Sequence, residues 1–345
     1  MGTATPAFLA ALFFGLSIPL CKLLLGETHP LVLSGLLYMG SGLALTVLTL
    51  ATGRSTAEAP LSREDAPWLA GAVLAGGILA PLAFLTGLNI TTGSAASLVL
   101  NLETPFTVLL AAVLFKEAIG RPAWAALACM LAGSVCLSYD PGLPTGSAAA
   151  KGPLLIAAAC GLWALDNNLT RNFSHKDPVS ASLIKGLAAG TALLALAAWF
   201  RIPLPGPAQA GAVLAVGAVC YGASLVLFIR SLRSIGTGRT GIIFATGPFI
   251  GSLASVLILR EGVAASLLAG GVLMAAGAWL LVRERHGHGH RHERLDHDHR
   301  HSHDDHHGHE HAQTPAQVEH SHPHVHPETV HTHPHRPDIH HRHPH

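Results

Sequence analysis

Apolar segments of about 20 residues follow one another along most of this 345-residue chain, and they restrict its fold more than any other feature. An α-helix rises about 1.5 Å per residue, so each segment can cross the hydrocarbon core of a bilayer. The segments lie at residues 5–25, 31–52, 66–88, 93–115, 122–139, 152–171, 178–200, 207–230, 238–259 and 264–282. They predict an all-α integral membrane protein with ten transmembrane helices.

One segment has a counterpart in the other half of the chain. Residues 93–117 and 238–261 both carry a Pro-Phe pair at the same place, and both end in a basic residue followed by Glu. We expect the two terminal pairs, Lys116–Glu117 and Arg260–Glu261, to be ion pairs that mark the membrane boundary. A repeat of this kind indicates two copies of one membrane module.

Five segments in each copy mean that the second copy enters the membrane from the opposite face. The sequence therefore predicts two inverted five-helix repeats, at residues 1–140 and 151–284, followed by a disordered His-rich tail at 285–345. The segment 140–151 is the expected hinge between the repeats.

Basic residues in the links predict the orientation. Those on the side of the N-terminus are Arg54, Arg63, Lys116, Arg121, Arg171, Lys176, Arg230, Arg233, Arg239, Arg283 and Arg285. The other side has only Lys22, Lys151, Arg201 and Arg260. Because cytoplasmic links carry more Lys and Arg, both termini are expected in the cytoplasm, with the chain in the bacterial inner (plasma) membrane.

Glu103 is an acid near the middle of its apolar segment, where a charge is costly. Asn101 lies two residues earlier, and the second copy has Phe244 and Thr246 at the corresponding positions, so the acid occurs once. One interpretation is a site for proton exchange or for the ammonium group of a substrate. The other is a protonated carboxyl that bonds to a neighbouring helix.

Pro105 and Pro248 occupy equivalent positions in the two copies, and each removes a helical hydrogen bond. Matching kinks indicate a binding site in some transporters, although they can also serve packing alone. Trp163 and Asn167 are four residues apart and share a helix face. They suit a cavity for a small organic solute, and packing or an interfacial position is the alternative.

Asp166 and Lys185 are equally distant from the turn between two adjacent antiparallel segments. They should therefore lie at the same depth, and a lone Lys there would be costly, so we predict an intramembrane ion pair. The pair is either structural or part of a substrate-binding or gating device.

The tail contains all but two of the 25 histidines, alternating with other residues. This spacing lets neighbouring imidazoles reach one divalent ion such as Zn, Ni, Co or Cu. The expected ligands are His286, His288, His290, His292, His297, His299, His301, His303, His320, His322, His324 and His326. A pH-responsive or merely tolerated tail is the alternative.

An enzymatic activity is not expected, because the chain has no recognisable nucleophile–base pair or phosphate loop. No cofactor is required, and nothing points to nucleic acid. The expected partners are the lipid bilayer, a small-molecule solute and metal ions on the tail, with a homodimer left open.

The run TGSAASLVLNLETPF at 92–106 resembles the fourth helix of EamA-type transporters of the drug/metabolite transporter superfamily. GLWALDNNLTR at 161–171 resembles the opening of their second repeat, and Arg239-Thr240-Gly241 with Gly247-Pro248-Phe249 resembles its penultimate helix. The resemblance covers residues 5–283 and implies a secondary active transporter that exports a small metabolite, amino acid or drug-like solute by alternating access. The tail keeps two alternatives open: a transition-metal cation transporter and a metal-responsive membrane protein.

Overall fold

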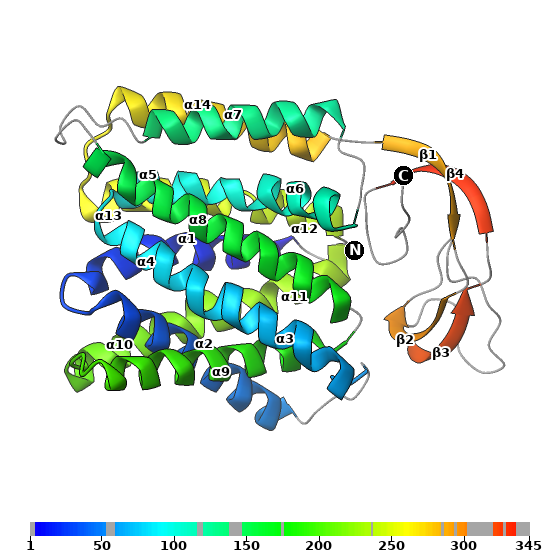
Figure 1. The fold of residues 1–345 in the computed structure, drawn as a ribbon, viewed down its shortest axis with the longest axis horizontal. Coiled ribbons are helices and arrows are strands. Elements are labelled where there is room, and N and C mark those ends of the chain that lie inside the picture. The colour runs from blue at the N-terminus through cyan, green and yellow to red at the C-terminus, as the bar shows by residue number, and fades with distance from the viewer. Residues whose placement is uncertain are drawn as a thin grey trace.

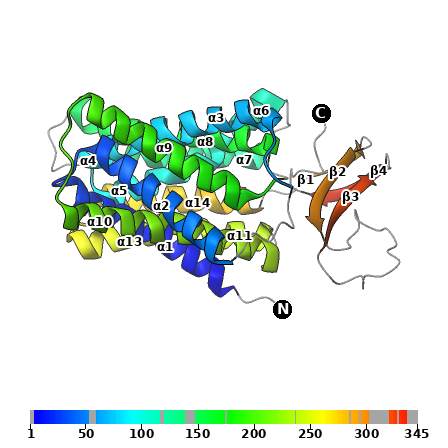
Figure 2. The same ribbon diagram turned by 90° about the horizontal axis from the view of Figure 1, so that it is seen from below.

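The structure is a computed structural model, and its membrane part is a bundle of helices (Figures 1 and 2). It describes residues 4–52, 59–115, 120–137, 147–173, 176–235, 237–283, 286–292, 295–301, 320–326 and 329–335. The hinge expected at 140–151 lies largely outside these residues, as do Lys116, Glu117 and His303.

The first repeat runs from α1 to α7. Its elements are α1 (Thr5–Leu25), α2 (Pro30–Thr52), η1 (Arg63–Asp65), α3 (Ala66–Ala72), η2 (Val73–Leu79), α4 (Ala80–Asn89), α5 (Gly93–Val99), η3 (Leu100–Leu102), α6 (Glu103–Phe115) and α7 (Arg121–Leu137).

The second repeat runs from α8 to α14. Its elements are α8 (Ser147–Thr170), η4 (Arg171–Phe173), α9 (Pro178–Trp199), α10 (Pro207–Val216), η5 (Gly217–Ala223), α11 (Ser224–Ile235), α12 (Thr237–Phe244), α13 (Gly247–Leu259) and α14 (Ala265–Arg283).

All ten expected segments are helical in the residues that the structure describes, which confirms the all-α membrane fold. Among the described residues, seven helices are long and apolar enough to cross a membrane, and α7 and α14 are shorter apolar helices. The 24-residue α8 is not one of the seven. Its second half carries Asp166 and two asparagines, which lower its mean hydropathy.

Both repeats interrupt their third and fourth segments at equivalent places. The third segments contain the π-helical turns η2 and η5, which begin 144 residues apart, close to the 143 residues that separate Pro105 from Pro248. The fourth segments break at η3 and at Ala245–Thr246. Pro105 and Pro248 lie in the first turns of α6 and α13, directly after these breaks, where a missing N–H costs little. The prolines therefore begin new helices instead of bending continuous ones.

The two repeats pack mainly on each other. Helix α2 packs on its counterpart α9, α7 packs on α14, and α5 packs on α13. Close contacts between small residues support this packing. A Cβ on Gly190, for example, would lie 2.7 Å from the backbone nitrogen of Met39. Figure 1 also shows that α1 begins and α14 ends at one end of the bundle, while the α4–α5 turn lies at the other.

The described residues of the tail include two pairs of strands. Strand β1 (His286–His292) pairs with β4 (Thr329–His335), and β2 (Leu295–His301) pairs with β3 (His320–His326), both antiparallel. The alternation of His with other residues has the two-residue period of a strand, which composition alone does not reveal. The register places His opposite His, for example His288 opposite His333.

Candidate functional site

Polar side chains from both repeats gather where α6, α8 and the π-helical turn η2 meet. We call this group the polar cluster. Its members are Tyr38, Gly76, Glu103, Thr107, Trp163, Asp166, Asn167 and Lys185. The cluster lies beside the break in the fourth segment, because Glu103 is the first residue of α6.

The Glu103 carboxylate is held by a neutral donor. Asn167 Nδ2 lies 2.9 Å from Glu103 Oε1 and 3.3 Å from Thr107 Oγ1. Thr107 also donates to the Glu103 carbonyl, one helical turn earlier, at 2.8 Å. Glu103 is partly buried and Asn167 is exposed, so this corner of the cluster is accessible.

The equivalent position in the second repeat has no acid. Thr246 is exposed, and its hydroxyl donates to the Ile243 carbonyl at 2.6 Å. The cluster is thus asymmetric within a symmetric scaffold.

Asp166 and Lys185 form the ion pair expected from their equal depth in adjacent helices. Thr170 donates to the other Asp166 carboxylate oxygen at 3.2 Å. Asp166 is buried, and a Cβ on Gly76 would lie 2.0 Å from its Oδ2, so only glycine leaves room for the carboxylate. Glu103 lies within electrostatic reach of both charges of the pair.

The carbonyl of Gly76 is a second centre of the cluster. It accepts hydrogen bonds from Tyr38 Oη at 2.8 Å and from Trp163 Nε1 at 3.1 Å. A π-helical turn alters the backbone hydrogen-bond pattern and frees carbonyls for side-chain donors, which is why such turns often occur at functional sites. The Trp163 ring is also held by Phe84, with ring centroids 5.7 Å apart.

Three cluster members were absent from the sequence analysis. Thr107 is detectable in principle, since it lies four residues from Glu103 on the same helix face. Tyr38 and Gly76 have no such signal, because their roles depend on contacts between helices far apart in the sequence.

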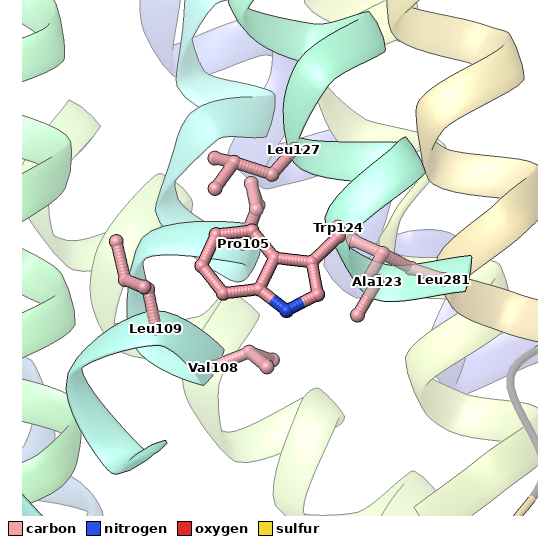
Figure 3. A pocket seen from close by; sticks show the side chains of 7 residues that line it. All are labelled: Pro105, Val108, Leu109, Ala123, Trp124, Leu127 and Leu281. Atoms are coloured by element: carbon pink, nitrogen blue, oxygen red, sulfur yellow. The ribbon is translucent and has the colours of Figure 1, made fainter. Parts of the chain in front are cut away.

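Three expected site residues lie outside the polar cluster. Asn101 is buried in the break and donates to the Leu98 carbonyl at 2.9 Å. The Pro248 carbonyl accepts from Ser97 Oγ at 2.6 Å, where α5 crosses α13. Pro105 lines a pocket together with residues of α7 and α14 (Figure 3). Of these contacts, the one between Ser97 and Pro248 joins the two broken helices.

The pocket beside Pro105 is apolar and small. It is lined by Pro105, Val108, Leu109, Ala123, Trp124, Leu127 and Leu281 (Figure 3). Its volume of about 10 Å³ is roughly the space of one water molecule. It therefore cannot hold a solute in this conformation.

Among the residues whose side chains the structure describes, no group of three or more His, Cys, Asp or Glu could hold a metal ion. The five cysteines are free thiols within the helical bundle. The expected tail ligands lie in the strands β1, β2 and β3, except His303, which lies outside the described residues.

The chain resembles known transporters along nearly its whole membrane part. The EamA-like transporter family matches residues 3–139 and again residues 150–283. A protein of Methanothermobacter thermautotrophicus described as an uncharacterized transporter is 29% identical over 286 residues, which are 79% of this chain and 83% of that protein. A crystal structure with 20% sequence identity has a TM-score of 0.59 and covers 81% of this chain and 95% of its own, so it shares the fold. With both repeats matched, the chain belongs to the EamA-like transporter family.

Proposed function

We propose that the protein is a secondary active transporter that exports a small organic solute by alternating access, with the polar cluster as its binding site. The observation that carries this proposal is the Glu103 carboxylate, which lies inside the membrane beside a helix break and is bonded to a neutral amide. Binding sites of transporters with inverted repeats typically lie at such interrupted helices near the midplane.

The charges of the cluster favour a positively charged partner. Asp166 and Lys185 neutralise each other, so the ionised cluster carries the charge of Glu103 in excess. A carboxylate in this place is costly unless a cation meets it, and the ammonium group of a solute or a coupling proton would do so. Amino acids, amine-containing metabolites and drug-like amines all offer such a group. Asn167 and Trp163 would then contact the neutral part of the solute.

The proposed location is the bacterial plasma membrane, with both termini in the cytoplasm. The excess of Lys and Arg in the links on the side of the N-terminus supports this orientation. The His-rich tail would then bind divalent metal ions on the cytoplasmic side, as a regulator or buffer beside the transported solute.

The test compares solute flux in proteoliposomes that contain the wild type, Glu103→Gln or the matched control Glu64→Gln. Glu64 is an exposed acid before the third membrane segment, far from the cluster in the chain. A panel of amino acids and organic amines is offered with and without a pH gradient. We expect Glu103→Gln to lower flux at least about tenfold, which is the loss of roughly 1.4 kcal/mol of interaction, and Glu64→Gln to leave it unchanged.

A panel of Zn, Ni, Co and Cu ions runs beside the organic solutes. Metal flux that depends on Glu103 would replace the organic-solute proposal with a metal transporter. Organic flux that is insensitive to Glu103→Gln would remove this residue from the mechanism.

A further inference from the structure

The turn between α4 and α5 is held by two opposite charges from outside it. Lys22, near the end of α1, donates to the carbonyls of Leu88 at 2.6 Å, Asn89 at 3.1 Å and Thr91 at 2.7 Å. These are carbonyls at or just beyond the C-terminus of α4, which have no helical partner of their own. A cation is also favoured there by the helix dipole.

Glu261 binds the other side of the same turn. Its carboxylate accepts from the backbone nitrogens of Gly93 at 2.6 Å and Ser94 at 2.8 Å, the first two residues of α5. The ion pair expected between Arg260 and Glu261 is therefore wrong, because Glu261 caps a helix of the other repeat. Lys22 and Glu261 also lie within electrostatic reach of each other.

This end of the bundle, which we call the turn end, is tightly closed behind the two charges. Every residue of α5 is buried, and α5 packs on α13. Ser97 Oγ lies 2.6 Å from the Pro248 carbonyl, and a Cβ on Gly251 would lie 2.3 Å from the same hydroxyl. Exposure begins at the breaks themselves, since Thr104, in the first turn of α6, and Thr246, in the break before α13, are both exposed.

We propose that Lys22 and Glu261 are the positioning residues of a gate that closes the turn end and separates it from the polar cluster. Glu261 comes from the second repeat and binds α5 of the first, so movement of one repeat relative to the other pulls on this contact. Lys22 holds the same turn from within the first repeat. Opening this end requires Glu261 to leave the N-terminus of α5 and Lys22 to leave the C-terminus of α4. The inference rests on the proposed transport function and assigns one step of that cycle to these residues.

The experiment measures access to Ser97→Cys, a nearly isosteric change at a fully buried position behind the gate. A membrane-impermeant maleimide is added to right-side-out and inside-out vesicles, and labelling of this position is read by mass spectrometry. The gate variants are Lys22→Gln and Glu261→Gln. The matched controls are Lys151→Gln, near the start of α8, and Glu27→Gln, in the link between α1 and α2; both residues are exposed.

We expect slow labelling of Ser97→Cys alone, and labelling at least about ten times faster when either gate residue is neutralised. The increase should occur in one vesicle orientation only, and Lys22→Arg should restore slow labelling. Unchanged labelling in the gate variants would overturn the proposal. An increase from both sides, or an equal increase in the controls, would also overturn it, because it would indicate general loosening.

The labelling is measured without a solute, so a failure of the gate proposal can be distinguished from a failure of the proposed transport function. Fast labelling in the gate variants, together with no measurable solute flux in the wild type, would support the gate and contradict the proposed transport function. Solute flux that depends on Glu103, together with slow labelling in every variant, would support the transport function and contradict the gate.

Discussion

Removing Lys185 tests the electrostatic design of the polar cluster most directly. In Lys185→Met, the Asp166 carboxylate stays buried and loses its cation, while Glu103 remains within electrostatic reach. The Asp166 side chain is only 6% exposed, so water cannot replace the lysine. The substitution therefore leaves two acids facing each other in the membrane interior.

The magnitude follows from charge separation and burial. Two unit charges about 4 Å apart attract by about 4 kcal/mol at an effective dielectric constant of 20. Removing one member of a buried pair typically costs about 3–5 kcal/mol, because the remaining charge is uncompensated. Asp166→Asn should cost less, since it leaves Lys185 near the Glu103 carboxylate. The double variant Asp166→Asn/Lys185→Met should be more stable than Lys185→Met, because neither charge remains.

The assay is thermal unfolding of the purified protein in detergent, followed by circular dichroism at 222 nm. A loss of about 4 kcal/mol should lower the Tm of Lys185→Met by about 10 °C. The matched control Lys151→Met, at an exposed lysine of α8, should change stability by less than about 0.5 kcal/mol. A Lys185→Met protein as stable as the wild type, or a double variant whose loss equals the sum of the single losses, would refute the reasoning.

Three further predictions use the same structure. Gly76→Ala should lower the Tm and solute flux, because its Cβ would lie 2.0 Å from Asp166 Oδ2, whereas Gly161→Ala, with nothing within 4 Å of its Cβ, should be tolerated in both assays. Trp163→Phe keeps an aromatic ring but loses the hydrogen bond to the Gly76 carbonyl. The free energy of unfolding should therefore fall by about 1 kcal/mol. Deletion of residues 285–345 should abolish Zn²⁺ and Ni²⁺ binding in isothermal titration calorimetry while leaving the Tm of the helical bundle unchanged; metal binding that persists in the truncated protein would contradict a metal site in the tail.

The membrane fold could be predicted from the sequence because a lipid bilayer allows few backbone structures to span it. Backbone polar groups must be satisfied within each spanning segment, so long apolar runs become helices. Five runs per copy then require the second copy to be inverted. The Asp166–Lys185 pair was predictable for a similar reason, since two neighbouring helices joined by a short turn set the depth of every residue.

The composition of the tail, in contrast, does not specify which of its segments pair with each other. Sequence neighbours were also insufficient to predict the partners of Glu261. Its sequence neighbour, Arg260, suggested a local ion pair, but the partners of Glu261 are backbone nitrogens of Gly93 and Ser94, more than 160 residues away.

The sequence by itself therefore determined the helices, their inversion and the single acid at Glu103. Only the tertiary structure decided which groups surround that acid and how the turn end is held shut. The reason is that spacing along one helix specifies which residues share a face, whereas a free carbonyl such as that of Gly76 acquires its partners only when other helices pack against it.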